Sequence, residues 1–261
     1  ITVYSTEGSN TKTFSDAVAV SEKVVIRSKN SWSSSHSTAP SVVDLGLSVN
    51  WATCNLGATS ETEYGDYYGW GCTVPYATST IPNWTAYFNK LGKTGTSYSE
   101  GTCGGDNDPL KTYVNDGTSI AGTDWDAAHE RLGGTWRMPT ANEFAELGND
   151  ANCQWTEVKD GNGNRIGWRV TSKKTGYTTN SIYVPTGGGL DNNYHGDTYR
   201  KGYYHIDKRC FYWTASPNDA SKAYDFVAPQ TSSDNADPGV GQYARFHGRT
   251  IRPVDKIYPN R

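Results

Sequence analysis

The 261-residue sequence lacks several features by which the function of a protein is often recognised. Hydrophobic residues make up only 35% of the chain, and no apolar run is long enough to span a membrane as a helix. The 24 lysines and arginines are nearly balanced by 27 aspartates and glutamates and form no basic patch, which argues against a nucleic-acid-binding protein. The sequence opens at Ile1 without a signal peptide, so we expect a mature fragment or an excised piece.

Sequence motifs of common enzyme classes are also missing. No glycine-rich phosphate loop follows a strand-like run, and no Gly-x-Ser-x-Gly pattern marks a serine nucleophile. The five cysteines include no Cys-x-x-Cys pair, so a zinc site is not expected. Two disulfides plus one free thiol would suit an exported protein, but the aromatic, strand-like surroundings of Cys54 and Cys210 favour burial as small hydrophobic residues. We therefore predict that the protein is not an enzyme.

Aromatic side chains are abundant, with 18 tyrosines and nine tryptophans, and glycine is frequent at 28 residues. A chain of this composition builds its core from a few large rings and has many turns, which favours an irregular α+β fold with long loops. Trp51, Trp136, Trp168 and Trp213 each occupy a strand-like or turn-like motif. We predict that these four rings are mostly buried and meet in one core.

The segment from residue 124 to residue 148 predicts two short helices joined by a tight turn. Asp124 is placed to cap a helix over residues 125–132 through its side-chain oxygen. Thr140 and Glu143 have the spacing of a capping box, in which each side chain bonds the backbone amide of the other residue. The second helix is expected to end at Gly148.

The rest of the chain indicates one large domain, over residues 43–256, with a mainly antiparallel sheet. Residues 1–42 are expected to be a β-rich extension or the tail of a preceding domain, and residues 257–261 a short tail. Two long excursions, Thr73–Gly122 and Gly187–Tyr204, are expected to be loops. Strands are predicted, by alternation and β-branched or aromatic content, at residues 42–47, 49–54, 154–158, 166–172, 181–184, 210–215, 223–227, 242–246 and 250–254.

Several motifs occur in the order typical of one protein family. They are Val43–Leu47 with Asn50–Ala58, Glu63–Gly71, Gly133–Thr140 with Glu143 and Phe144, and Tyr212–Ser216 with Ile251–Val254. Together they resemble the Fibrobacter succinogenes major paralogous domain, which is common in exported proteins of Bacteroidetes. The resemblance implies a C-type-lectin-like domain, and the Arg137–Thr140 motif is also similar to the formylglycine-generating enzymes. Those enzymes use two cysteines late in the fold, whereas here only Cys210 is late, so their oxidase chemistry is not expected.

The best candidate site in the sequence is the loop from Asp191 to Asp197. Its carboxylates, amides, imidazole and tyrosine could bind a sugar, and hard cations such as calcium prefer the same oxygen-rich loops. An ordinary turn rich in Asp and Asn is the simpler alternative. Because long loops carry recognition on rigid scaffolds, ligand contacts are predicted in the two excursions. The predicted ligand-binding residues are Trp84, Tyr87, Asp191, Tyr194, His195 and Asp197.

Three other polar clusters have residue types that could form metal or sugar sites. Asp126 and His129 would share a helix face, but capping and a satisfied polar contact explain them better. Residues 106–108 contain two aspartates without the glycine and distal glutamate of a calcium loop. Residues 217–219 only faintly resemble the motif of calcium-dependent lectins. No cofactor is therefore expected, although calcium remains open.

These observations predict an exported binding or adhesion module, at the bacterial cell surface or free outside the cell. The expected partner is an extracellular glycan or protein, with further domains of the same polypeptide as neighbours and no nucleic acid or membrane span. Two alternatives remain: a structural terminal domain of a fimbrial or multidomain surface protein without a small ligand, and, with less support, an oxidase relative.

Overall fold

The computed structural model describes residues 39–77, 82–92, 103–191, 202–228 and 238–256. The chain divides into two units, Ile1–Ser35 and His36–Arg261, and every element described below belongs to the second unit.

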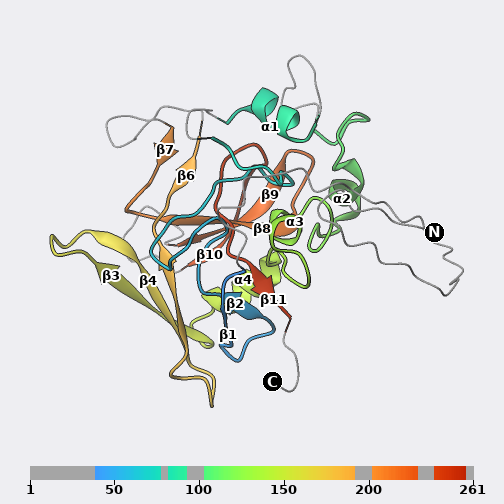
Figure 1. The fold of residues 1–261 in the computed structure, drawn as a ribbon. Coiled ribbons are helices and arrows are strands. Elements are labelled where there is room, and N and C mark those ends of the chain that lie inside the picture. The colour runs from blue at the N-terminus through green and yellow to red at the C-terminus, as the bar shows by residue number, and fades with distance from the viewer. Residues whose placement is uncertain (1–38, 78–81, 93–102, 192–201, 229–237, 257–261) are drawn as a thin grey trace, which may run out of the picture. The chain divides into compact units, whose positions relative to one another are not determined.

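Short strands dominate the described residues, and every sheet is antiparallel. The strands are β1 (Val42–Val43), β2 (Asn50–Ala52), β3 (Cys153–Lys159), β4 (Arg165–Ser172), β5 (Ser181–Pro185), β6 (Gly189–Leu190), β7 (Tyr203–Tyr204), β8 (Cys210–Pro217), β9 (Lys222–Ala228), β10 (Gly239–Ala244) and β11 (Val254–Asp255). They form sheets in the orders β1-β2-β11, β10-β9-β8, β3-β4-β5 and β6-β7. The hairpin β3–β4 extends away from the other elements (Figure 1). The predicted α+β class with mainly antiparallel strands is confirmed.

The excursion Thr73–Gly122, predicted as a loop, contains two helices, so that prediction was wrong. Helix α1 spans Trp84–Lys90 and begins at Asn83, whose side chain accepts a hydrogen bond from an amide in the first turn. Helix α2 spans Lys111–Asp116 and ends at Gly117, whose backbone is left-handed. Both helices are short and bury few side chains, so hydrophobic periodicity gave little sign of them.

Helix α3 spans Ala127–Leu132 and begins at Asp126 rather than at the predicted Asp124. The Asp126 carboxylate accepts hydrogen bonds from two amides at the start of α3. It also accepts one from Gly122 N and one from Met138 N, each at 2.8 Å. One fully buried carboxylate therefore holds both the entry to α3 and the strand-like segment that leads to the next helix.

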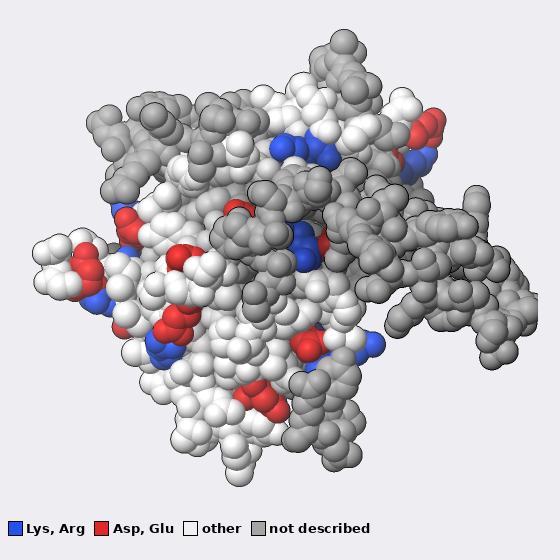
Figure 2. All heavy atoms as spheres, viewed as in Figure 1, with Lys and Arg blue, Asp and Glu red and all other residues white. Residues whose placement is uncertain are grey.

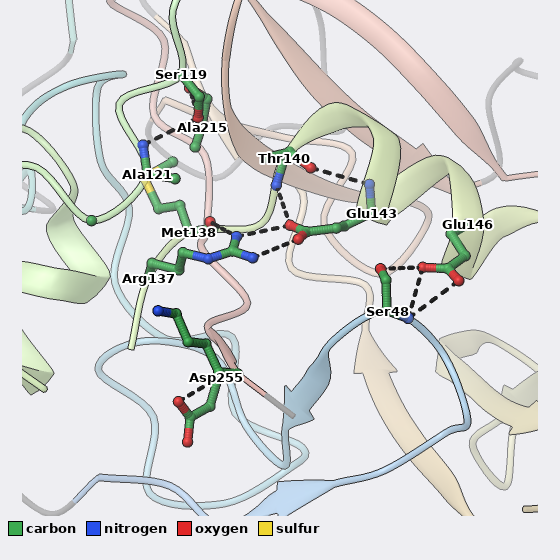
Figure 3. A network of polar contacts seen from close by, with 12 residues as sticks. Ser48, Ser119, Ala121, Arg137, Met138, Thr140, Glu143, Glu146, Ala215 and Asp255 are labelled. Carbon is green, nitrogen blue, oxygen red and sulfur yellow. Dashed lines mark hydrogen bonds and ion pairs between the residues drawn. The ribbon is translucent and has the colours of Figure 1, made fainter. Parts of the chain in front are cut away.

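Helix α4 spans Ala141–Gly148 and has the capping box predicted from Thr140 and Glu143. The Thr140 hydroxyl accepts from Glu143 N at 3.3 Å, and Thr140 N donates to the Glu143 carboxylate at 2.7 Å. Arg137 donates to both oxygens of that carboxylate (Figure 3). Burial opposes ionisation of Glu143, but the bonds from Arg137 and Thr140 outweigh it and hold the Glu143 pKa below its usual value.

The hydrophobic interior contains two large clusters, and the four tryptophans do not meet in either one. Trp213 is fully buried in the cluster that packs against α1 and α2, whereas Trp51 is fully buried in the cluster beneath α4. Trp136 and Trp168 are only half-buried. Trp136 lies in the turn between α3 and α4, and the Arg165 guanidinium covers the Trp168 ring at 4.8 Å. The single-core prediction was therefore wrong.

Three arginines in the C-terminal segment are buried, and two of them connect distant parts of the fold. Arg245 forms an ion pair with Asp108 at 2.5 Å, with both side chains inaccessible to solvent. Arg252 donates to the carbonyl oxygens of Ala52 and Tyr183 at 3.0 and 2.8 Å. The C-terminal segment thus ties the helical side of the domain to β2 and β5.

Candidate functional site

The described part of the chain contains three of the six predicted ligand-binding residues. Tyr87 is fully buried in the core, so its assignment to a binding surface was wrong. Trp84 is half-buried and packs against Tyr87 at 5.6 Å between ring centroids. Asp191 is buried at the end of β6. The other three predictions, Tyr194, His195 and Asp197, lie outside the described residues.

The segment Tyr243–Arg249 links Trp84 and Asp191, which come from different excursions. The Phe246 ring lies 4.6 Å from Trp84 and 4.2 Å from the ring of His247. His247 Nδ1 lies 3.3 Å from a carboxylate oxygen of Asp191. One short segment therefore brings together parts of the chain that the sequence separates by about a hundred residues, and we take it as the candidate site.

The backbone of this segment is fixed by a turn and by a close backbone contact between Gly248 and Leu190. Strand β10 ends at Ala244, and His247 N donates to Ala244 O at 3.1 Å. Gly248 and Leu190 then exchange two backbone hydrogen bonds of 2.9 and 3.0 Å. A Cβ atom at Gly248 would lie 2.6 Å from Leu190 Cβ, so only glycine allows this approach. The strand predicted over 242–246 accordingly stops two residues early.

A fully buried guanidinium, that of Arg249, lies at the centre of the site. Its Nε is 3.2 Å from an Asp225 carboxylate oxygen, and an Nη donates to the hydroxyl of Tyr204. Four rings surround the guanidinium at 4.5–5.6 Å: Tyr243, Phe211, Tyr204 and Trp213. Its Nη2 has no hydrogen-bond partner among the described residues.

The pKa values of this ion pair are shifted by its burial. Burial lowers the pKa of Arg249 to about 9, which leaves the guanidinium charged at neutral pH. Burial also raises the pKa of Asp225 to about 7. The aromatic rings around Arg249 compensate part of its lost hydration through cation–π attraction.

His247 is neutral at neutral pH, although a carboxylate lies beside it. Burial lowers the pKa of its imidazole to about 4, and the opposing attraction of Asp191 is the smaller effect. Tyr243 packs edge-on against His247 at 4.4 Å and leaves 39% of its own surface exposed. The site therefore presents a solvent-exposed phenol ring in front of a buried polar layer, which suits contact with a ligand that has an apolar face.

Sequence reasoning did not identify Tyr243, His247 or Arg249. The available signal was the five-residue run Arg245–Arg249, which contains two arginines and a histidine. It lies in a part of the sequence that is rich in strands and mostly uncharged. Charged residues in such a run are usually exposed, so only the tertiary structure shows that this run is buried.

The other polar clusters serve the fold. His129 Nδ1 lies 3.2 Å from Trp136 O, and the neighbouring Asp126 carboxylate bonds backbone amides. Asp108 pairs with Arg245, and Asp219 accepts bonds from amides of its own turn. No group of three His, Cys, Asp or Glu side chains in the described residues could hold a metal ion. Calcium binding remains a prediction, because residues 192–197 of the Asp191–Asp197 loop lie outside the described residues.

All five cysteines are buried and none forms a disulfide, so the disulfide alternative was wrong and the buried-thiol interpretation is confirmed. Burial raises the pKa of Cys210 to about 12 and that of Cys153 to about 11. Thiols of this kind are poor nucleophiles.

Comparisons with models of protein families, with curated proteins and with solved structures found no match. No helix in the described residues is both long and apolar enough to cross a membrane. On the face shown in Figure 2, lysine and arginine side chains lie scattered among aspartate and glutamate rather than in one patch.

Proposed function

We propose that residues 43–256 form the ligand-binding domain of an exported bacterial surface protein, with a C-type-lectin-like arrangement and a glycan as its ligand. Support comes from the ordered sequence motifs, from the α+β class with antiparallel sheets, and from the long segments between short regular elements. In this proposal the domain binds its ligand and catalyses no reaction.

The observation that carries the proposal is the exposed Tyr243 ring at the meeting point of the two excursions. Tyr243 lies against His247, which contacts Asp191, and Phe246 continues the aromatic surface to Trp84. Carbohydrate sites in proteins combine an aromatic ring for the apolar face of the sugar with nearby polar groups for its hydroxyls. Among the large hydrophobic side chains of the described residues, only those of Val42 and Tyr243 are exposed. Tyr243 is therefore the one exposed aromatic ring of that group.

A glycan array probed with the 261-residue protein tests the proposal, followed by affinity measurements on the best neutral or charged hit. Tyr243→Ala and Trp84→Ala should each weaken binding by at least about tenfold, the usual loss when a central aromatic contact is truncated. Tyr177→Ala, at a half-buried tyrosine in the turn between β4 and β5, is the matched control and should bind like the wild type.

An array without hits, or full affinity in both folded variants, would contradict the proposal. The first result would favour the alternative in which the domain is a structural module of a larger surface assembly. In that case the buried charges of the candidate site would act only in holding the fold together.

A further inference from the structure

The turn His205–Arg209, which connects β7 to β8, has an unusual backbone. His205 and Asp207 have φ angles of 53° and 60°, and they are the non-glycine residues with positive φ among those described. The amides of Lys208 and Arg209 both donate to His205 O, at 3.2 and 3.0 Å. A positive φ angle is energetically unfavourable for residues other than glycine, and such backbone strain is concentrated at functional sites.

Three consecutive glycines, Gly187–Gly189, pack against this turn and the tyrosines next to it. A Cβ atom at Gly187 would lie 3.1 Å from Tyr64 Cβ, and one at Gly188 would lie 2.3 Å from Tyr204 O. A Cβ atom at Gly189 would lie 2.8 Å from the Tyr204 ring. The glycine run is therefore needed for the turn and its tyrosines to pack this closely, and it gives a structural reason for an unusual sequence feature.

The turn is also held in place by a residue far away in the sequence. The Tyr64 hydroxyl donates to an Asp207 carboxylate oxygen at 2.6 Å, and Asp207 N donates to Thr186 O at 2.9 Å. The one carboxylate of the turn is therefore engaged by Tyr64. A turn that is fixed before the ligand arrives loses little entropy on binding.

Two cations project from this turn without a carboxylate partner. Lys208 is exposed and Arg209 is half-buried, and neither forms an ion pair with any described residue. Both are close enough to His205 to lower the pKa of its imidazole, after the larger effect of burial. Arg165, which is already paired with Glu157, donates to Lys208 O at 3.0 Å and adds a third positive side chain nearby. A half-exposed guanidinium without a carboxylate partner keeps its donors available to bind an anion.

We propose that the His205–Arg209 turn binds an acidic saccharide, with the sugar's carboxylate or sulfate group on Arg209 and Lys208. The guanidinium fork matches the two oxygens of such an anion, which a lysine alone cannot do. The ring of Tyr64, beside the turn, provides an aromatic surface for the sugar. This inference rests on the proposed function, since it names the chemical class of the glycan and a second place where it is bound.

The test uses the 261-residue protein and three oligosaccharides of equal length: a sulfated heparin fragment, an oligogalacturonate and a neutral maltooligosaccharide. Calorimetric titration at low and high salt should show tighter binding of the two acidic ligands, with the preference reduced by salt. Arg209→Gln should lower their affinity at least tenfold, and Lys208→Gln should lower it less. Lys256→Gln, which removes the same charge next to β11, is the matched control and should leave affinity unchanged.

Equal affinity for acidic and neutral ligands would overturn the inference, and so would full acidic-ligand affinity in Arg209→Gln. If that variant does not fold, Arg209→Lys keeps the charge and removes the fork, and it should still lose affinity. Tyr64→Phe releases Asp207 and should weaken acidic ligands while melting close to the wild type. A glycan that loses affinity in Tyr243→Ala but not in Arg209→Gln would overturn this inference and leave the proposed function standing.

Discussion

The helix-pair region, residues 126–143, and the C-terminal segment, residues 245–252, both bury charged groups, but they satisfy them over different distances along the chain. Arg137 reaches Glu143 across six residues. In the C-terminal segment, Arg245 reaches Asp108 across 137 residues, and Arg252 reaches Ala52 across 200.

This difference in sequence distance implies different roles for the buried charges. Partners close in sequence stabilise one local element, whereas distant partners hold separate parts of the fold together. In the helix-pair region, the bonds of Glu143 start a helix whose sequence already favours it, so losing one bond frays a helix end. In the C-terminal segment, Arg245 bonds Asp108 and Arg252 bonds Ala52, and both partners are far away in the sequence. Removing one leaves a buried, uncompensated group in the middle of the domain, which costs much more.

The largest expected effect is at the Arg245–Asp108 pair. Arg245→Met should lower the free energy of unfolding by about 3–5 kcal/mol, because the Asp108 carboxylate is left buried without its partner. Urea denaturation measures this loss. Adding Asp108→Asn to the same protein removes the stranded charge and should recover part of the stability. If Arg245→Met alone is as stable as the wild type, the pair does not stabilise the contact between Asp108 and the C-terminal segment.

One tryptophan in each region allows the stability losses of the two regions to be compared directly. Trp213 is fully buried and donates to Tyr68 O at 2.8 Å beneath the C-terminal segment, so Trp213→Ala should cost about 3–5 kcal/mol. Trp136 is half-buried in the turn between α3 and α4, and Trp136→Ala should cost clearly less. Thermal melts of the two variants rank them, and the reverse order would place the main core at the helix pair.

Acid should remove the stabilising contribution of His247 before it removes that of Glu143. The folded-state pKa of His247, about 4, is below its usual 6.5, so the unfolded chain binds a proton first. The contribution of His247 to stability is complete above pH 6.5 and should fall by about 3 kcal/mol as the pH drops to 4. Asp225 acts in the opposite direction, because its folded-state pKa is raised to about 7 and the folded protein therefore binds its proton first. Glu143, whose pKa is also lowered, loses its contribution only below its usual 4.5. His247→Gln should flatten the loss between pH 6.5 and 4.5 in denaturation curves, and an unchanged slope would assign it to other groups.

The smallest effect is expected at the capping box. Thr140→Ala removes the hydroxyl that accepts from Glu143 N and should cost about 1 kcal/mol. Thr178→Ala, in an exposed turn, is the matched control and should be neutral within the precision of urea denaturation. A loss at residue 140 as large as that of Arg245→Met would remove the contrast between the two regions.

The same contrast explains which features could be predicted from the sequence. The capping box of Thr140 and Glu143 depends on a three-residue spacing, and most strands depend on alternation within seven or eight residues, so both were found. The cap of α3 was misplaced by two residues because Asp124 and Asp126 are equally suitable on local grounds. What separates them is the distant amide of Met138, which only Asp126 can bond.

The candidate site could be predicted only in outline. The sequence predicts the excursions that hold Trp84 and Asp191 to be recognition loops, and nothing in the structure tests that role. Tyr87 is predicted as a surface ring, but a short helix buries it. Tyr243, His247 and Arg249 could not be found, since their roles depend on contacts with β6, β7 and β9 that no local pattern records.

The five buried cysteines, none of which is in a disulfide, have a consequence for how the protein unfolds. In the native state the thiols are shielded, and reductant should leave the melting temperature unchanged. Once the chain opens, all five become accessible together, with pKa values near those of ordinary cysteine. Under oxidising conditions the unfolded molecules can then cross-link through intermolecular disulfides before they refold. Under such conditions the lifetime of the protein would therefore be set by its rate of unfolding rather than by its equilibrium stability.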